Sequence, residues 1–351
     1  MKKTDKITRN IKQIIRHFGT ISGFFLLLLL FSCNGLFMDE QKSNTAKNNF
    51  DLLWKIIDER YCFFEEKGVD WNQMYEKYSQ RINFNDIEPA SPHLFSVMVF
   101  MLEELRDGHV CLDDGLFGSR CYTGWQGSPA DNTNFHSPAS LSGTTEIRSG
   151  LSTFRILPES IGYIRCPSFS EKFNRNDLEK AIAGFEGLGL KGLIIDIRGN
   201  GGGYVSEAYL LASKFVSEKT KVGYARYKIG KRHDDFSEFF ARHIEPDGAV
   251  FSGNVVILTN RRVYSAANMF VSIMKCLPQV YIIGDLTGGG GGAPISAELL
   301  NGWTVKFSTN PVFDTEKESI EQGVLPHQII TNGANNRDNV FEAARQWILE
   351  R

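Results

Sequence analysis

The stretch that decides the fold reads Ile194-Ile195-Asp196-Ile197-Arg198-Gly199-Asn200-Gly201-Gly202-Gly203. A second stretch, about sixty residues later, reads Leu258-Thr259-Asn260-Arg261-Arg262-Val263-Tyr264-Ser265-Ala266-Ala267. Each begins as an apolar, strand-like run, passes through a polar turn and enters a helical pattern. The first turn offers glycine backbone N–H groups, and the second places a serine beside a helix N-terminus. Because these are two parts of an acyl-transfer site, a serine hydrolase is the first hypothesis.

Around these two stretches, strand-like and helical patterns alternate. This alternation predicts an α/β core with a mixed, mostly parallel sheet covered by helices. The predicted strands cover 161–166, 192–197, 255–259, 280–284 and 303–308. The predicted helices cover about 177–188, 204–216, 265–276 and 339–350. The charged and aromatic segment 218–252 has no clean period and is a candidate flap over the site.

The N-terminal half predicts a small helical subdomain. One amphipathic helix follows from apolar residues at helical spacing, namely Phe50, Leu53, Trp54, Ile57 and Tyr61. A second helix should begin at Ser91-Pro92, a cap followed by proline, and end at Gly108, which places His109 at the helix exit. We therefore expect a helical subdomain at 48–110, a loop-rich connector at 111–150 and the α/β core at 151–351.

The first 32 residues have the features of an export signal. A basic segment precedes an apolar run that is short for a membrane span and ends in Leu30-Phe31-Ser32-Cys33, which resembles a bacterial lipobox. Cys33 would then be the lipidated first residue, followed by a polar tether up to 47. The alternative is an uncleaved signal anchor with an incidental cysteine. The expected location is the bacterial cell envelope, anchored by lipid to the outer membrane and facing either the periplasm or the surface.

Charge and cysteine usage argue against a nucleic-acid-binding protein and against a metal site. Removing the net +5 of residues 1–32 from the −2 of the whole chain leaves about −7, and an acidic chain without basic clusters argues against nucleic acid as a partner. The five remaining cysteines show no CxxC spacing, so no metal site is expected. Cys111 and Cys121 are the closest pair for a disulfide, a pairing that the sequence leaves open.

Six segments in this order resemble the tail-specific, or C-terminal processing, peptidase family, in particular its tricorn-protease-like branch. The resemblance runs from about Phe50 to Pro326. The segments are Leu105-Arg106-Asp107-Gly108-His109-Val110, Ile161-Gly162-Tyr163-Ile164-Arg165, the runs 192–203 and 258–267, Ile283-Gly284-Asp285-Leu286-Thr287-Gly288, and Glu321-Gln322-Gly323-Val324-Leu325-Pro326. The resemblance implies a crotonase-like α/β core preceded by a helical segment, and cleavage of peptide bonds by a serine nucleophile without a metal or an organic cofactor.

The resemblance also implies roles for individual residues. Ser265 corresponds to the nucleophile, although a serine before a helix is most often a plain N-cap. His109 corresponds to the general base of the tricorn-like branch, and its alternative reading is a histidine stabilised by a helix C-terminus. Glu321 is the candidate for orienting the imidazole, with Glu318 left open as the other carboxylate.

Two backbone N–H groups, those of Gly202 and Ala266, are the expected oxyanion hole. Many members of the family use a lysine about 25 residues after the serine, where this chain has the glycine-rich run 287–292, so a Ser–Lys dyad is not expected. Most members also carry a PDZ domain between the histidine and the next core strand. About forty residues are available here, which is below the size of an independent domain.

Three functions fit these features to different degrees. The leading hypothesis is a lipid-anchored serine endopeptidase of the cell envelope acting on polypeptides. The second is a catalytically inactive peptide-binding protein on the same fold, favoured by the missing lysine. The third, an acyl-CoA enzyme of crotonase type, conflicts with export. The sequence leaves the cleavage specificity and the oligomeric state open.

Overall fold

A computed structural model describes residues 43–116, 118–127, 146–330 and 338–351. The described residues from 45 onward form one compact unit. The export signal and Cys33 lie outside the described residues, as does most of the tether. In the described ranges no helix has both the length and the apolar character needed to cross a bilayer.

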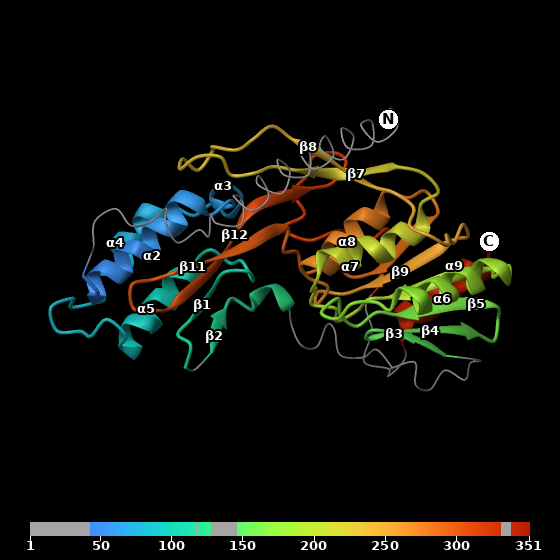
Figure 1. Cartoon of the computed structure of the whole chain (residues 1–351), viewed down its shortest axis with the longest axis horizontal. Helices are drawn as coiled ribbons and strands as arrows, with labels where there is room; N and C mark the ends of the chain where they lie inside the picture. The colour runs from blue at the N-terminus through green and yellow to red at the C-terminus, as the bar shows by residue number, and fades with distance from the viewer. Residues whose placement is uncertain (1–42, 117, 128–145, 331–337) are drawn as a thin grey trace, which may run out of the picture. The chain divides into compact units, whose positions relative to one another are not determined.

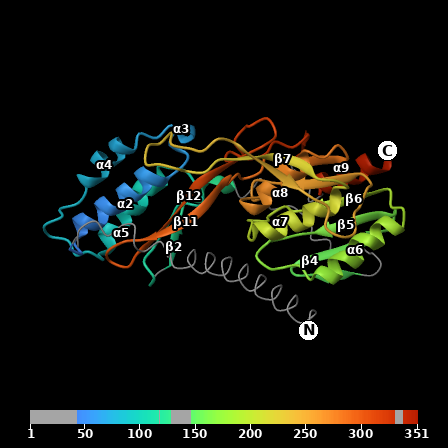
Figure 2. The same ribbon diagram turned by 45° about the horizontal axis from the view of Figure 1, so that its top comes forward.

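The described residues form a seven-stranded sheet in the order β13-β10-β9-β6-β5-β4-β3. Its strands are β3 (Ile147–Ser149), β4 (Ser152–Leu157), β5 (Ile161–Arg165), β6 (Gly192–Asp196), β9 (Val255–Thr259), β10 (Val280–Gly284) and β13 (Gln328–Ile329). Strands β13, β10, β9, β6 and β5 pair in parallel, and β4 and β3 add antiparallel pairs. Figure 1 labels β4, β5 and β9 of this sheet, and Figure 2 labels β4, β5 and β6. The predicted class, a mixed and mostly parallel α/β core, is confirmed.

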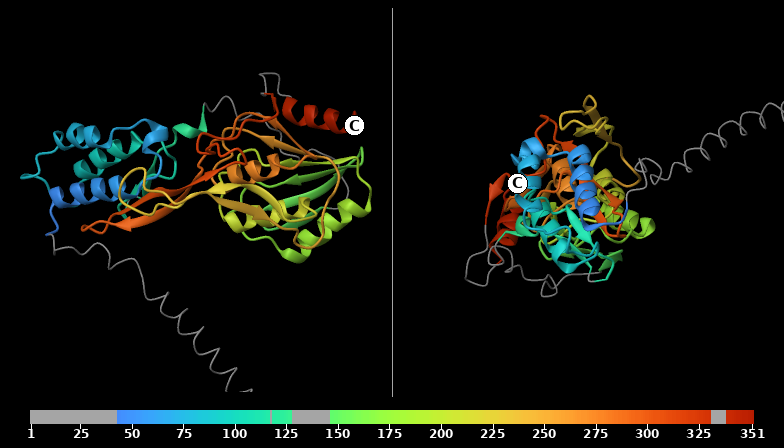
Figure 3. Two further views of the ribbon diagram at one scale, coloured as in Figure 1. Left: turned by 90° about the horizontal axis from the view of Figure 1, so that it is seen from above. Right: turned by 90° about the vertical axis from the view of Figure 1, so that its left-hand side faces the viewer.

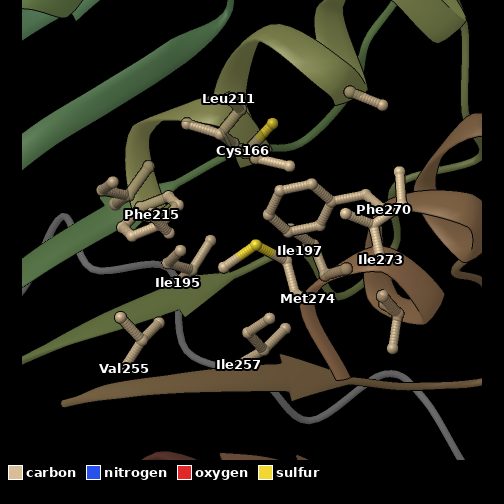
Figure 4. Packing of buried hydrophobic residues seen from close by; sticks show 14 of the residues in the cluster. Cys166, Ile195, Ile197, Leu211, Phe215, Val255, Ile257, Phe270, Ile273 and Met274 are labelled. Carbon is tan, nitrogen blue, oxygen red and sulfur yellow. The ribbon is translucent and has the colours of Figure 1, made fainter. Parts of the chain in front are cut away.

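Helices cover both faces of this sheet, which explains the continuous apolar runs of β6 and β9. The helices are α6 (Arg175–Gly187), α7 (Val205–Ala212), α8 (Ala266–Lys275) and α9 (Asn339–Leu349). Ile194 packs with α9, while Ile195 and Ile197 on the other face pack with α6, α7 and α8. Figure 3 shows α9 and α6 on opposite sides of the sheet, and Figure 4 shows the second cluster around Ile195 and Phe270.

The N-terminal helices form as their caps and apolar spacing predict. They are α2 (Ala46–Arg60), α3 (Phe64–Lys67), α4 (Trp71–Ser79) and α5 (Pro92–Glu103). The hydroxyl of Ser91 accepts the N–H of Leu94 at 3.1 Å, which is the expected N-cap of α5. The predicted end at Gly108 is wrong: α5 ends at Glu103, and Arg106 adopts a φ of 49°. His109 therefore follows a turn rather than the helix itself.

A second sheet, whose strand pairs are antiparallel, lies against these helices. It comprises β1 (Cys111–Asp113), β2 (Ser119–Cys121), β7 (Thr220–Ala225), β8 (Phe240–Ile244), β11 (Gly292–Glu298) and β12 (Thr304–Phe313). A disulfide joins Cys111 and Cys121 across β1 and β2, so the pairing that the sequence left open is formed. Side chains of β12 and of the turn before it share one hydrophobic core with α2 and α5, although they lie far apart in sequence.

The segment 218–252, the candidate flap, contains the hairpin of β7 and β8. Residues 226–239 connect these strands and reach α2 and α3 (Figure 1). His233 Nε2 lies 2.9 Å from an Asp58 oxygen, and the His233 ring stacks on Phe64 with centroids 4.3 Å apart. This connection is thus held to the N-terminal helices.

Candidate active site

Ser265 lies at the turn between β9 and α8, with a φ of 57° and a ψ of −122°. An L-residue rarely adopts such a conformation, which costs about 1–3 kcal/mol where the surrounding structure imposes it. The Ser265 N–H donates to Gly289 O at 2.9 Å and so ties the turn to the glycine-rich segment. A plain N-cap serine has extended backbone and accepts a helix N–H, but Ser265 makes no such capping bond to the described helix. The turn presents this hydroxyl instead of using it as a cap.

His109 contacts that hydroxyl directly. Its Nε2 lies 2.9 Å from Ser265 Oγ. Asp107 Oδ1 accepts the backbone N–H of His109 at 2.8 Å and the Tyr264 hydroxyl at 3.3 Å. The His109 and Tyr264 rings pack with centroids 5.0 Å apart. Asp107 and Tyr264 together fix the turn that carries the imidazole.

The surroundings of His109 favour the neutral imidazole. Burial lowers the pKa of His109 below its ordinary value of 6.5. The negative charge of Asp107 opposes this shift, whereas the positive charges of Lys306 and Lys67 add to it. A neutral imidazole at pH 7 is the form that can accept a proton. The second ring nitrogen, Nδ1, lies 3.5 Å from Ser308 Oγ.

The contacts of Glu321 differ from the prediction. We expected its carboxylate to orient the His109 ring, but within the described residues its hydrogen-bond partners are Lys67 Nζ at 2.7 Å and Gly291 N at 2.8 Å. Lys67 comes from α3, and both side chains are buried. The alternative, Glu318, is exposed, and its backbone pairs with Asp314. Glu321 therefore holds the glycine-rich segment beside Ser265 and does not contact the imidazole.

Burial makes the charged form of Glu321 unfavourable even beside Lys67. Burial, together with the nearby Asp107, raises the pKa of Glu321 to about 8, while Lys67 acts to lower it. The carboxylate is thus sensitive to any change in its lysine partner.

The expected oxyanion donors differ in availability. Ala266 is the first residue of α8, so its N–H has no partner within that helix. The Gly202 N–H instead donates to Asn200 Oδ1 at 2.9 Å. Asn200 O also accepts the Tyr264 N–H at 3.0 Å, which joins the glycine loop to the serine turn. A Cβ on Gly202 would lie 2.9 Å from Ser265 Cβ, so the close approach of the two turns requires glycine here.

Trp125, from the connector, covers the other side of Tyr264. Their rings stack with centroids 4.0 Å apart. A Cβ on Gly108 would lie 2.5 Å from Trp125 Nε1 and 2.8 Å from the Tyr264 hydroxyl, so a residue larger than glycine does not fit here without movement. A cavity of about 310 Å³ adjoins this stack. Its lining includes Lys67, Arg106, Trp125, Arg261, Tyr264 and Glu321.

Sequence reasoning missed four of these residues: Lys67, Asn200, Trp125 and Ser308. Asn200 could have been found, because an asparagine two residues before a glycine is typical of a side chain that accepts that glycine's N–H. The other three reach the site through tertiary packing and leave no local pattern. In the described part of the chain, no three histidine, cysteine or acidic side chains gather as metal ligands would.

Comparisons with known proteins agree with this geometry. Residues 160–330 match Peptidase family S41, and residues 43–86 match the Tricorn protease C1 domain. A solved structure described as "a putative peptidase from Parabacteroides merdae ATCC 43184" is 37% identical, with a TM-score of 0.79, and the match covers 88% of this chain and 98% of that one. The Carboxy-terminal processing protease CtpA of Bacillus subtilis is 29% identical over 168 residues, which are 48% of this chain and 34% of that protein. The chain thus matches about a third of that curated relative.

The crystal structure of the tricorn protease shares the fold, with a TM-score of 0.55 at 16% identity, over 87% of this chain and 37% of that one. A serine at a strand–turn–helix junction beside a buried histidine, on this α/β scaffold, defines the class as serine peptidase. The chain belongs to peptidase family S41.

Proposed function

We propose that this protein is an endopeptidase that cleaves polypeptides with Ser265 as nucleophile and His109 as general base. The observation that carries this proposal is the 2.9 Å contact between His109 Nε2 and Ser265 Oγ. The strained backbone of Ser265 supports it, because such strain persists where function requires a side chain to be presented. The neutral state of His109 supports it as well, because only the neutral ring accepts the serine proton.

The chemistry follows from these positions. His109 Nε2 takes the proton of Ser265 Oγ as the oxygen attacks the substrate carbonyl carbon, and His109 then returns that proton to the leaving amine. The Ala266 N–H donates to the developing oxyanion. Gly202 is the second proposed donor, and it must leave Asn200 Oδ1 in order to serve.

We further propose an envelope location with Cys33 as the lipid-bearing residue. The lipobox-like run ending at Cys33 supports it, and so does the Cys111–Cys121 disulfide, which is typical of oxidising compartments. Metabolic labelling with a radioactive fatty acid should mark the wild type and not Cys33→Ala. Labelling of both proteins would refute the assignment.

The test of the peptidase proposal is labelling of the full-length protein with a fluorophosphonate. Wild type should be labelled, and Ser265→Ala and His109→Ala should not. Ser206→Ala, which removes a serine from the start of α7, is the matched control and should be labelled like wild type. Parallel assays follow cleavage of unfolded casein. A folded wild type without labelling or cleavage would refute the proposal and favour an inactive peptide-binding protein.

A further inference from the structure

The buried side of the His109 ring faces a hydroxyl group that the family resemblance does not assign. Ser308, in the middle of β12, is fully buried, and its Oγ lies 3.5 Å from His109 Nδ1. Two backbone contacts fix its position. Ser308 pairs with Pro294 of β11, and its carbonyl oxygen accepts the N–H of Cys62 at 3.2 Å. The hydroxyl is therefore held on a rigid strand beside the ring.

Within the described residues, neither nearby carboxylate is hydrogen-bonded to Nδ1, and Asp107 Oδ2 is buried without a hydrogen-bond partner. Glu321 accepts from Lys67 and from the backbone of Gly291. Asp107 Oδ1 accepts from the backbone of His109 and from Tyr264, so this oxygen fixes the turn and not the ring. In the described ranges, Ser308 Oγ is the hydrogen-bond partner recorded for Nδ1.

The tautomer of the ring decides whether it can act as a base. For Nε2 to accept the Ser265 proton, the neutral ring must carry its hydrogen on Nδ1. A buried N–H without an acceptor is costly, so an acceptor at Nδ1 favours this tautomer over the reverse one. Ser308 Oγ is an acceptor at that place.

We propose that Ser308 is a positioning residue that accepts the Nδ1–H of His109 and so keeps Nε2 free to act on Ser265. This inference rests on the proposed function. Ser308 takes the place that a carboxylate holds in the usual serine triad. The transferred proton moves from Ser265 Oγ to Nε2 and on to the leaving nitrogen, while the Nδ1 proton stays on the ring. A hydroxyl adds no full charge beside the imidazolium, and the negative charge that acts on the ring is that of Asp107.

The tautomer can be measured without any turnover. Full-length protein labelled with ¹⁵N-histidine gives ring nitrogen shifts that separate the two tautomers above the His109 pKa. The chain has seven histidines, so the His109 signals are assigned by their loss in His109→Ala. Wild type should show hydrogen on Nδ1, and Ser308→Ala should show a mixture. Thr309→Ala is the matched control, because it removes a buried hydroxyl from the next residue of β12 that bonds to Ala293 O and should leave the tautomer unchanged.

Kinetics provide the second readout. Loss of the acceptor leaves a buried N–H unpaired, which should lower kcat of Ser308→Ala by about 10- to 100-fold with KM within about twofold. Thr309→Ala should keep wild-type kcat. Hydrogen on Nε2 in wild type, or an unchanged tautomer in folded Ser308→Ala, would overturn the proposal. Hydrogen on Nδ1 in wild type and a mixture in Ser308→Ala, without fluorophosphonate labelling of wild type, would refute the peptidase function and support the Ser308 hydrogen bond.

Discussion

The contact between the glycine loop and the serine turn can be tested with Gly202→Ala. Gly202 has a φ of 101°, and a Cβ built there would lie 2.8 Å from Tyr264 O, 2.9 Å from Ser265 Cβ and 3.0 Å from Ala266 N. Comfortable non-bonded contacts are about 3.5–4.0 Å, so the serine turn must move by roughly 0.5–1 Å. All three atoms belong to the turn that carries Ser265. The substitution therefore acts on the position of Ser265 as well as on stability.

Two effects of different size follow. Backbone strain at positive φ costs about 1–3 kcal/mol, so the free energy of unfolding should fall by about that amount. A misplacement of about 1 Å at a reacting group can cost about 100-fold in rate, so kcat/KM should fall by roughly two orders of magnitude. The loss of activity should therefore exceed what the small unfolded fraction explains.

Gly201→Ala is the matched control. Nothing lies within 4 Å of a Cβ built on Gly201, and its φ is not positive. Both variants should be compared by thermal unfolding and by the rate of fluorophosphonate labelling at Ser265. Gly201→Ala should behave as wild type. A Gly202→Ala protein that is destabilised but labelled at the wild-type rate would refute the reasoning, as would equal damage from both substitutions.

Three further predictions concern the surroundings of the site. Burial and neighbouring positive charge lower the pKa of His109, and only the neutral ring can accept a proton. The value of kcat/KM should therefore persist as the pH falls through 6.5 and decline only at lower pH. A decline centred at or above 6.5 in a pH–rate profile would contradict this. Lys67→Met should destabilise the fold by about 1–3 kcal/mol in urea unfolding at pH 7, because it leaves the buried Glu321 carboxyl group without its partner. Since the pKa of Glu321 is raised to about 8, the group holds its proton at pH 7, and the loss should grow as the pH rises and the carboxyl group becomes charged. The double variant Lys67→Met/Glu321→Leu should recover much of that loss, and additive losses would show that the pair does not interact. Gly108→Ser should displace the Trp125 ring, which would alter tryptophan fluorescence and slow fluorophosphonate labelling. The double variant Gly108→Ser/Trp125→Ala should restore labelling. A Gly108→Ser protein indistinguishable from wild type would show that the site has room for serine.

The sequence predicts those helices and strands whose packing produces a recognisable pattern in neighbouring residues. β6 and β9 are buried on both faces, so they appear as unbroken apolar runs. Ser91 marks the start of α5 because a cap acts on the helix immediately after it. β7 and β8 were not foreseen as strands, because their charged and exposed positions hide the alternation that a half-buried strand should show.

The site divides in the same way. Ser265 and His109 could be proposed because they lie in segments that resemble the peptidase family, and Ser265 also follows an apolar strand-like run. The partner of Glu321 could not, since Lys67 lies on a four-residue helix with no pattern of its own and reaches the carboxylate only through packing. The hydroxyl of Ser308 was likewise hidden, because nothing within β12 distinguishes it from a buried structural serine.

The core shared by the N-terminal helices and β12 has a consequence for the order of folding. The helix that precedes His109 cannot complete its packing until Trp303, Val305 and Phe307 are available, and these lie near the other end of the chain. Ser265, by contrast, sits on a helix packed in a different core. A chain that emerges from its N-terminus therefore contains both reacting groups before it can bring them together. Nascent or truncated forms that lack β12 would carry Ser265 without a packed His109, so the proposed activity should appear only after β12 has been made.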